Sequence, residues 1–426
     1  MKTFVGIILI VFSSIFIHAQ SALERKLFEL NDVIFEKIET PKGFQSAYKL
    51  YVKQPLDHAD YSKGFFYQKV YLSHRNIESP TVMITEGYER PTNRVYELTE
   101  MLNANQVQIE HRYYGESMPD SLDYSYLNMR NATHDFHKIN FLLKSIYPDD
   151  WICTGISKGG QTTIFYRYFF PYDVEVSVPY VAPLNTSIED KRIYQFLNKV
   201  GDQKCREKII SFQKKLLSQR EECLAKLKWY VKGADLKFSY LTMEQAFEYA
   251  VLEYSFSFWQ WGTKCEDIPN ENSSNDVLLN HLIEVSGLSF FSDTDMKKYA
   301  SHYYQAATEL GYYGYEIAPF KELIKTLPNK TNPSAVFAPK EVNAPFDAIL
   351  TNKVYKWVQE KGDEFIYIYG GNDTWTATGV SENKNRNAKW YVLEGKDHGQ
   401  ARIKNLSENQ KSELLSTIQK WLKEKQ

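Results

Sequence analysis

Residues 151–160 read Trp-Ile-Cys-Thr-Gly-Ile-Ser-Lys-Gly-Gly, a Gly-x-Ser-x-Gly pattern between a short β-prone apolar run and a helix-compatible one. A serine on a tight turn from strand to helix has strained torsions, and Gly155 and Gly159 let the two elements approach closely. The hydroxyl of Ser157 would then stand clear of the sheet. The backbone N–H of Lys158 would lie at a helix N-terminus, where it can stabilise an oxyanion. Because the pattern is short, its partners elsewhere in the chain must decide whether Ser157 is a nucleophile.

Short strands alternate with helices around this turn. Residues 45–74 favour antiparallel strands that open a sheet. Further strands are expected at 81–85, 106–109, 174–181, 365–369 and 390–393, and one begins at Trp151. Helices are expected at 94–101, 135–146, 161–170, 347–360 and 410–423. This alternation predicts a mostly parallel sheet with helices on both faces.

The pattern changes between about residues 184 and 332, where no convincing strand occurs. Long charged and aromatic segments there favour helices, and these include 193–200, 207–228, 276–285 and 293–310. We therefore predict an α/β core from residues 20–184 and 333–426, with a helical cap inserted at 185–332. A chain of 426 residues is longer than one ordinary core requires, which fits this division. Such a cap would cover the turn at Ser157.

A serine nucleophile needs a base to take its proton and an acid to orient that base. Asp373 follows the strand at 365–369, and His398 follows the strand at 390–393. The order serine, acid, histidine, each after a strand, is that of an α/β-hydrolase. We therefore predict a triad of Ser157, Asp373 and His398. Asp397 is an alternative acid, although its adjacency to His398 makes the required geometry awkward.

The second oxyanion donor is expected from the loop after the strand at 81–85, through the backbone of Gly87 or Tyr88. Metal catalysis has no support, since the sequence contains neither a His-x-x-x-His pair with a nearby acid nor a Cys-x-x-Cys pair. No cofactor is expected. The near balance of 51 basic and 53 acidic residues gives no electrostatic case for nucleic-acid binding.

The first nineteen residues have the pattern of a signal peptide. Lys2 is the charged start, residues 4–17 form an apolar run, and Ile17-His18-Ala19 precedes a cut before Gln20. The apolar run would span about 21 Å as a helix, which is too short for the roughly 30 Å of hydrocarbon in a membrane. We expect a secreted or periplasmic protein without a membrane anchor.

Four cysteines allow disulfides in an exported protein. Cys153 lies in the strand before the turn, where a buried free thiol is expected. Cys205 and Cys223 fall in a helical stretch, and an unbroken helix would separate them by about 27 Å, beyond the bridging limit of about 7 Å. They can pair only if that helix turns back. Otherwise Cys265 pairs with one of them, and the sequence leaves the choice open.

Two further blocks resemble a known group of peptidases. Residues 110–117, Glu-His-Arg-Tyr-Tyr-Gly-Glu-Ser, resemble the signature of the lysosomal-type prolyl carboxypeptidases and dipeptidyl peptidases and their secreted bacterial relatives. Residues 304–313 resemble a second block of this group, with Ala307 where many relatives carry cysteine. The motif around Ser157 is similar to that of the secreted bacterial tripeptidyl and prolyl tri/tetrapeptidyl aminopeptidases.

This resemblance implies an exopeptidase that releases short peptides from a free amino terminus. A buried carboxylate facing the substrate's ammonium would set the register, because leaving a buried charge unpaired is costly. The candidates for this carboxylate are Glu86 and Glu309, followed by Glu89 and Glu116. For each of them, a solvent-exposed position or a structural contact with Arg112 is an equally good explanation. Arg112 is a further candidate for substrate binding.

Other readings of the same residues stay open. The cluster Tyr312-Tyr313-Gly314-Tyr315 could contact substrate, although packing within the cap is its simpler role. A secreted carboxylic-ester hydrolase would use the same triad, but a lipase would carry a more apolar cap. A binding protein on a hydrolase scaffold would be expected to have lost a member of the triad, and none is missing.

Overall fold

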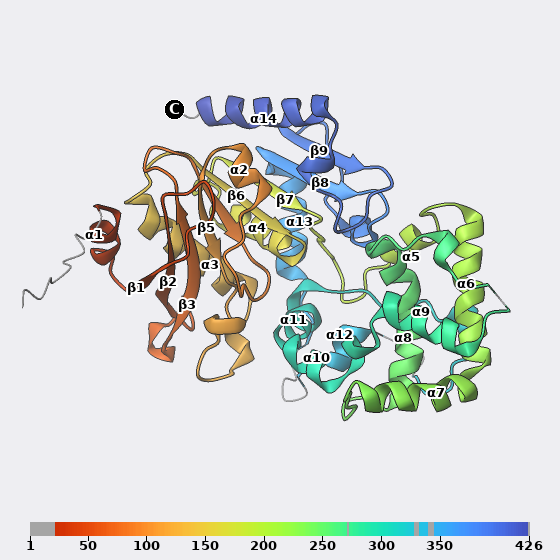
Figure 1. Cartoon of the computed structure of the whole chain (residues 1–426). Coiled ribbons are helices and arrows are strands. Elements are labelled where there is room, and N and C mark those ends of the chain that lie inside the picture. Colours follow the sequence, from red (N-terminus) through yellow and green to blue (C-terminus); the bar gives the residue numbers. More distant parts are fainter. Residues whose placement is uncertain (1–21, 271, 328–331, 340–344, 425–426) are drawn as a thin grey trace, which may run out of the picture.

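The computed structural model describes residues 22–270, 272–327, 332–339 and 345–424 (Figure 1). The expected signal peptide at 1–19 lies outside these residues. A nine-stranded sheet forms the centre of the fold, in the order β1-β2-β3-β5-β4-β6-β7-β8-β9. The strands are β1 (Val33–Ile38), β2 (Ser46–Pro55), β3 (Phe65–His74), β4 (Thr81–Thr85), β5 (Asn105–Ile109), β6 (Trp151–Ile156), β7 (Val176–Tyr180), β8 (Phe365–Gly370) and β9 (Ala388–Leu393).

The sheet is antiparallel at its beginning and parallel elsewhere. Strands β1, β2, β3 and β5 pair antiparallel in that order, and β5, β4, β6, β7, β8 and β9 pair parallel. Parallel strands end at the same edge of a sheet, so the loops after β4, β6, β8 and β9 meet there. The α/β-hydrolase core predicted from the sequence is confirmed. The strand β1 was not among the expected elements.

Alternation of side chains along the strands explains why helices cover both faces. On β4, Val82 and Ile84 pack with α2 (Glu97–Met101) and α14 (Glu408–Lys423), whereas Met83 between them packs with α3 (Met129–Lys144) on the opposite face. On the same face as α3, helices α4 (Lys158–Phe169) and α13 (Ile349–Lys361) cover β8. A short helix, α1 (Ala22–Phe28), packs against this side of the sheet.

The chain forms a group of helices after β7 and before α13, green to cyan in Figure 1. They are α5 (Arg192–Leu197), α6 (Gln203–Ser218), α7 (Arg220–Gly233), α8 (Met243–Gln260), α9 (Asn275–Ser286), α10 (Asp293–Lys298), α11 (Ala300–Gln305), a π-helical turn (Ala306–Leu310) and α12 (Pro333–Phe337). Helix α8 is buried on nearly all sides and forms the centre of this group. Because its apolar residues show no one-sided stripe, helical periodicity did not single it out.

The single helix expected at 207–228 is in fact two helices. Gln219 leaves the helical region, with φ −102° and ψ 26°, and separates α6 from α7. Even so, Cys205 and Cys223 do not pair. Cys205 forms a disulfide with Cys265, across Cα atoms 5.6 Å apart, and Cys223 is a buried free thiol. Cys153 is also free and buried, as the sequence predicts.

The boundary expected at residue 332 divides helices that pack together. Helix α12 packs against α11, and the ring of Phe337 contacts those of Tyr249, Phe291 and Tyr303 in the cap. We therefore propose that the cap begins near residue 185, as expected, and extends through α12 to Phe337.

Candidate active site

Ser157 occupies the turn between β6 and α4 in a strained conformation. Its torsions are φ 58° and ψ −124°, outside the ordinary regions for a residue with a side chain. A Cβ atom on Gly155 would lie 2.3 Å from the carbonyl oxygen of Gly159. One on Gly159 would lie 2.6 Å from the carbonyl oxygen of Thr85. Both glycines are therefore required for the strand and helix to meet at this turn.

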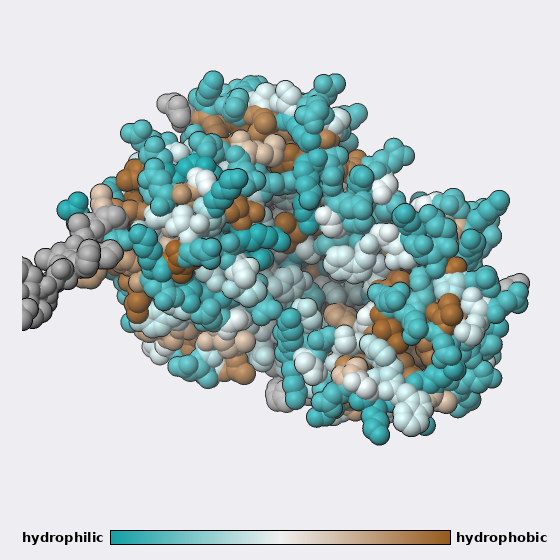
Figure 2. Space-filling model, viewed as in Figure 1, coloured by the Kyte–Doolittle hydropathy of each residue, from teal (hydrophilic) through white to brown (hydrophobic). Residues whose placement is uncertain are grey.

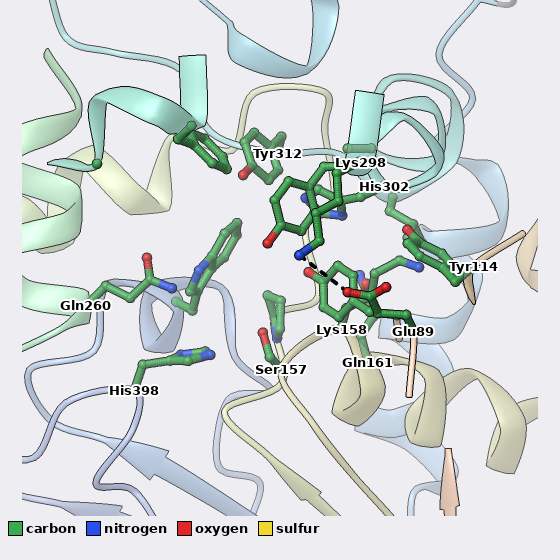
Figure 3. A pocket seen from close by; sticks show the side chains of 18 of the residues that line it. Glu89, Tyr114, Ser157, Lys158, Gln161, Gln260, Lys298, His302, Tyr312 and His398 are labelled. Atoms are coloured by element: carbon green, nitrogen blue, oxygen red, sulfur yellow. Dashed lines mark ion pairs between the residues drawn. The ribbon is translucent and has the colours of Figure 1, made fainter. Parts of the chain in front are cut away.

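His398 and Asp373 form a hydrogen-bonded pair beside this turn. The Nδ1 atom of His398 lies 2.8 Å from Oδ2 of Asp373, and both side chains are buried. Asp373 Oδ1 accepts the backbone N–H of Trp375 at 3.1 Å, which fixes the carboxylate. With Nδ1 engaged, the Nε2 atom of His398 is left to face the cavity, and Figure 3 shows the ring directed toward Ser157.

The alternative acid, Asp397, is engaged within its own loop. Its Oδ1 atom accepts the backbone N–H groups of Gly399 and Gln400, each at 2.8 Å. The structure therefore provides His398 with Asp373 as its carboxylate partner, in agreement with the order of residues along the chain.

The loop after β4 packs directly on the serine turn. A Cβ atom on Gly87 would lie 2.6 Å from Cβ of Lys158 and 2.7 Å from the backbone nitrogen of Gly159. The side-chain nitrogen of Lys158 donates to the carbonyl oxygen of Gly87 at 2.7 Å. The Gly87–Tyr88 peptide is thereby held beside the first turn of α4, where an oxyanion hole would form.

A cavity of about 750 Å³ opens above Ser157, between the core and the cap (Figures 2 and 3). Ser157 and His398 line its core side. Its cap side is mostly aromatic and polar and includes Glu253, Ser257, Gln260, Trp261, Tyr299, His302, Tyr312 and Tyr313. This volume falls in the usual range for sites that bind small ligands.

A family model described as PS-10 peptidase S37 matches residues 27–424. The chain belongs to this family. It is therefore a serine peptidase, and the resemblance noted in the sequence is confirmed.

Relatives of this S37 peptidase include two named exopeptidases. The prolyl tri/tetrapeptidyl aminopeptidase of Streptomyces mobaraensis is 29% identical over 410 residues, which cover 94% of this chain and 85% of the relative. The lysosomal Pro-X carboxypeptidase of Bos taurus is 27% identical over 155 residues, 32% of this chain and 31% of the relative. Among solved structures, a proline iminopeptidase from Mycobacterium smegmatis has a TM-score of 0.40 at 11% identity, covering 88% of this chain and 98% of that one.

Two of the proposed substrate-binding carboxylates of this S37 peptidase have other partners. Glu86 lines the cavity, but it accepts hydrogen bonds from Tyr96, Gln108 and Arg90 at 2.5, 2.8 and 2.9 Å, so its charge is already satisfied. Glu309 accepts the backbone N–H of Met129 with both oxygens, at 2.9 and 3.1 Å. It therefore stabilises the N-terminus of α3, and it is not among the residues that line the cavity.

Glu116 and Arg112 lie outside the cavity lining. Glu116 is half exposed and pairs with Lys69 at 2.9 Å. Arg112 is fully buried, donates to both oxygens of Asp135 at 2.7 and 2.8 Å, and also donates to backbone carbonyls. These contacts support a structural role for Arg112, so the substrate role suggested for it finds no support. Glu89 pairs with Lys298 at the cavity, at 3.4 Å (Figure 3).

The side chain of Lys158 is part of the site, in addition to the backbone N–H expected from the sequence. The nitrogen lies 5.4 Å and 4.9 Å from the ring centres of Tyr88 and Tyr114. Burial lowers the pKa of Lys158 to about 7. Burial, with the nearby Lys158 charge, also lowers the pKa of His302 to about 3, which keeps this imidazole neutral. The one available sequence signal was a lysine directly after the serine.

Glu253 was missed as well. It lies between Leu252 and Tyr254, in the apolar second half of helix α8, and it lines the cavity. An acidic residue inside such an apolar run is a usable signal, because a buried carboxylate requires partners. Within the described ranges, no group of three or more histidine, cysteine, aspartate and glutamate side chains could hold a metal ion. The described helices include none that is long and apolar enough to cross a membrane.

Proposed function

We propose that this S37 peptidase is an exported aminopeptidase that releases short peptides from the free N-terminus of its substrates. The observation that carries this proposal is the pairing of His398 with Asp373, beside Ser157, in a cavity that the cap covers. The name of the Streptomyces mobaraensis relative supports release of three or four residues. A cap over the site favours short segments, because a long chain could not lie across it.

The reaction would proceed through an acyl-enzyme. Ser157 Oγ attacks the scissile carbonyl carbon while Nε2 of His398 takes its proton. The resulting oxyanion accepts hydrogen bonds from the backbone N–H of Lys158 and from that of Gly87 or Tyr88. The C–N bond then breaks, and His398 gives its proton to the leaving amine.

Water completes the cycle. His398 removes a proton from a water molecule that attacks the acyl carbon, and the released Ser157 oxygen regains a proton from the same imidazole. Asp373 stays ionised, holds the Nδ1–H tautomer of His398 and stabilises the imidazolium that forms in both steps. Each oxyanion donor is worth about 3 kcal/mol of transition-state stabilisation.

The proposal is tested by mass spectrometry of products from a pool of peptides with free and acetylated N-termini. Wild-type protein should release tripeptides or tetrapeptides from the free termini, with far slower cleavage of the acetylated peptides, and Ser157→Ala should release none. Cleavage of acetylated peptides at an equal rate would contradict the aminopeptidase assignment. Hydrolysis of esters without any peptide cleavage would favour the carboxylic-ester hydrolase.

Export is supported by the apolar leader at 4–17 and by the Cys205–Cys265 disulfide, since disulfides persist in oxidising compartments. Fractionation of the producing cells should place the protein in the periplasm or medium, with Gln20 as its first residue. Recovery from the cytosol with Met1 or Lys2 at its start would contradict export.

A further inference from the structure

Four glutamates line the cavity, and three of them have simple explanations. Glu86 is paired with Arg90 at 2.9 Å, and Glu89 with Lys298 at 3.4 Å. Glu284 is exposed to water on α9. Glu253 differs, because it is only 3% exposed and has no cationic partner within 4 Å among the described residues. A buried carboxylate without a counter-charge at a ligand cavity calls for a cation in the ligand.

Three neutral hydroxyl groups hold Glu253 in place. Ser257 Oγ donates to Oε1 at 2.7 Å, while the hydroxyls of Tyr313 and Tyr315 donate to Oε2 at 2.9 and 2.6 Å. An ionised carboxylate has about four acceptor positions, so Oε1 retains one. These donors orient the carboxylate but do not neutralise it. Burial raises the pKa of Glu253 to about 7, because it disfavours the ionised form. A cation beside the carboxylate would stabilise that ionised form.

Aromatic packing makes this arrangement rigid. The ring of Tyr313 stacks between Phe256 and Tyr312, with ring centres 3.8 and 4.3 Å away. Trp375, which follows the acid Asp373 by two residues, packs against the same rings. The carboxylate is therefore fixed relative to the catalytic loop of the core.

One face of α8 connects Glu253 to the catalytic histidine. Glu253, Ser257 and Gln260 recur at helical spacing and line the cavity. The carbonyl oxygen of Gln260 accepts the backbone N–H of His398 at 3.0 Å. Seven residues of α-helix rise about 10 Å. Three residues of extended peptide also span about 10 Å, so the length of α8 from Glu253 to the end that contacts His398 is that of a short peptide.

We propose that Glu253 binds the N-terminal ammonium of the substrate and thereby sets the number of residues released. This rests on the proposed aminopeptidase function and extends it to a residue in the cap. An acetylated substrate would bring a neutral amide to the carboxylate and lose the ion pair.

The test compares Glu253→Gln with wild type on one peptide with a free or an acetylated N-terminus. We expect kcat/KM for the free peptide to fall about 100-fold, mainly through KM, while the acetylated peptide is unaffected. The variant should also release products of mixed length. Glu309→Gln is the matched control, since burial raises its pKa to about 7 as well but it lies off the cavity lining. It should keep the wild-type preference for the free peptide.

Labelling of Ser157 by a fluorophosphonate reports whether each variant is folded and catalytically assembled, without using the ammonium. A labelled Glu253→Gln protein that keeps the full preference for free peptides would overturn the role of Glu253 alone. If wild type cleaves no peptide, the aminopeptidase function itself fails and this inference fails with it. If Glu253→Gln does not label, wild type is tested on a peptide whose terminal amine is replaced by hydroxyl. A kcat/KM about 100-fold below that of the peptide with the amine supports the ion pair. Equal kcat/KM values for the two peptides overturn it.

Discussion

The side-chain nitrogen of Lys158 lies 2.7 Å from the carbonyl oxygen of Gly87, which links the nucleophile turn to the loop of the second oxyanion donor. Hydrogen bonds polarise one another, so a donor on the Gly87 carbonyl strengthens the N–H of the same peptide, which belongs to Tyr88. We infer that Tyr88, of the two expected candidates, supplies that N–H. Lys158 is thus a positioning residue in addition to a backbone donor.

Replacement of Lys158 by methionine should lower kcat about tenfold and leave KM within about twofold. The side chain acts through a carbonyl, so its loss should cost less than the 100-fold or more associated with removing an oxyanion donor outright. Steady-state kinetics on a tripeptide-releasing substrate measures both constants. A KM increase with unchanged kcat would indicate a role in binding substrate instead.

The lowered pKa of Lys158 should make the stability of the protein depend on pH. Its pKa is about 7 in the folded protein and near 10.5 when unfolded, so the unfolded chain holds more protons between these values. The free energy of unfolding should therefore rise with pH from about 7 to 10.5, and fall as pH returns toward 7. Urea denaturation across this range should show a shallower slope for Lys158→Met. Equal slopes would mean that Lys158 keeps an ordinary pKa when folded.

Substitution of the two neighbouring acids should separate their roles. Asp373→Asn should lower kcat by about 10⁴, because an amide favours the wrong tautomer of His398. Asp397→Asn retains an oxygen that can accept the N–H groups of Gly399 and Gln400, so its kcat should stay within about threefold of wild type. Circular dichroism provides the check on folding. The reverse pattern of activities would make Asp397 the acid.

The cysteine pairing is open to direct chemical mapping. Alkylation of denatured, unreduced protein should modify Cys153 and Cys223, whereas Cys205 and Cys265 should react after reduction. The bridge closes a loop of 60 residues, which corresponds to about 4 kcal/mol in the chain-entropy model. Replacing both bridged cysteines by serine should lower stability by about that amount in urea denaturation. A peptide linked through Cys223 would refute the pairing.

Arg112→Lys should reduce stability without changing substrate affinity. Lysine keeps the charge beside Asp135 but cannot reproduce the two-pronged contact or the bonds to the carbonyls of Leu56 and Tyr126. A loss of about 2 kcal/mol is expected from urea denaturation, with KM within about twofold of wild type. A large KM increase in a stably folded variant would restore the substrate role for Arg112.

The sequence was most informative where local rules apply. The order of strands and helices, the Gly-x-Ser-x-Gly turn and the positions of Asp373 and His398 after their strands all follow from short-range patterns. Helix boundaries were less well predicted. The break at Gln219 and the helix α8 escaped periodicity, because tertiary packing decides both.

The α/β-hydrolase core and the family resemblance were thus determined by sequence alone, because strand alternation and the serine turn impose local backbone requirements. The partners of buried charges were decided only by the tertiary structure. Four glutamates were candidates in the sequence and Glu253 was not among them, yet folding pairs Glu86 with Arg90, directs Glu309 to the N-terminus of α3 and leaves Glu253 facing the cavity. A buried carboxylate acquires its role from groups brought within a few ångströms by folding, and spacing along the chain does not encode those contacts.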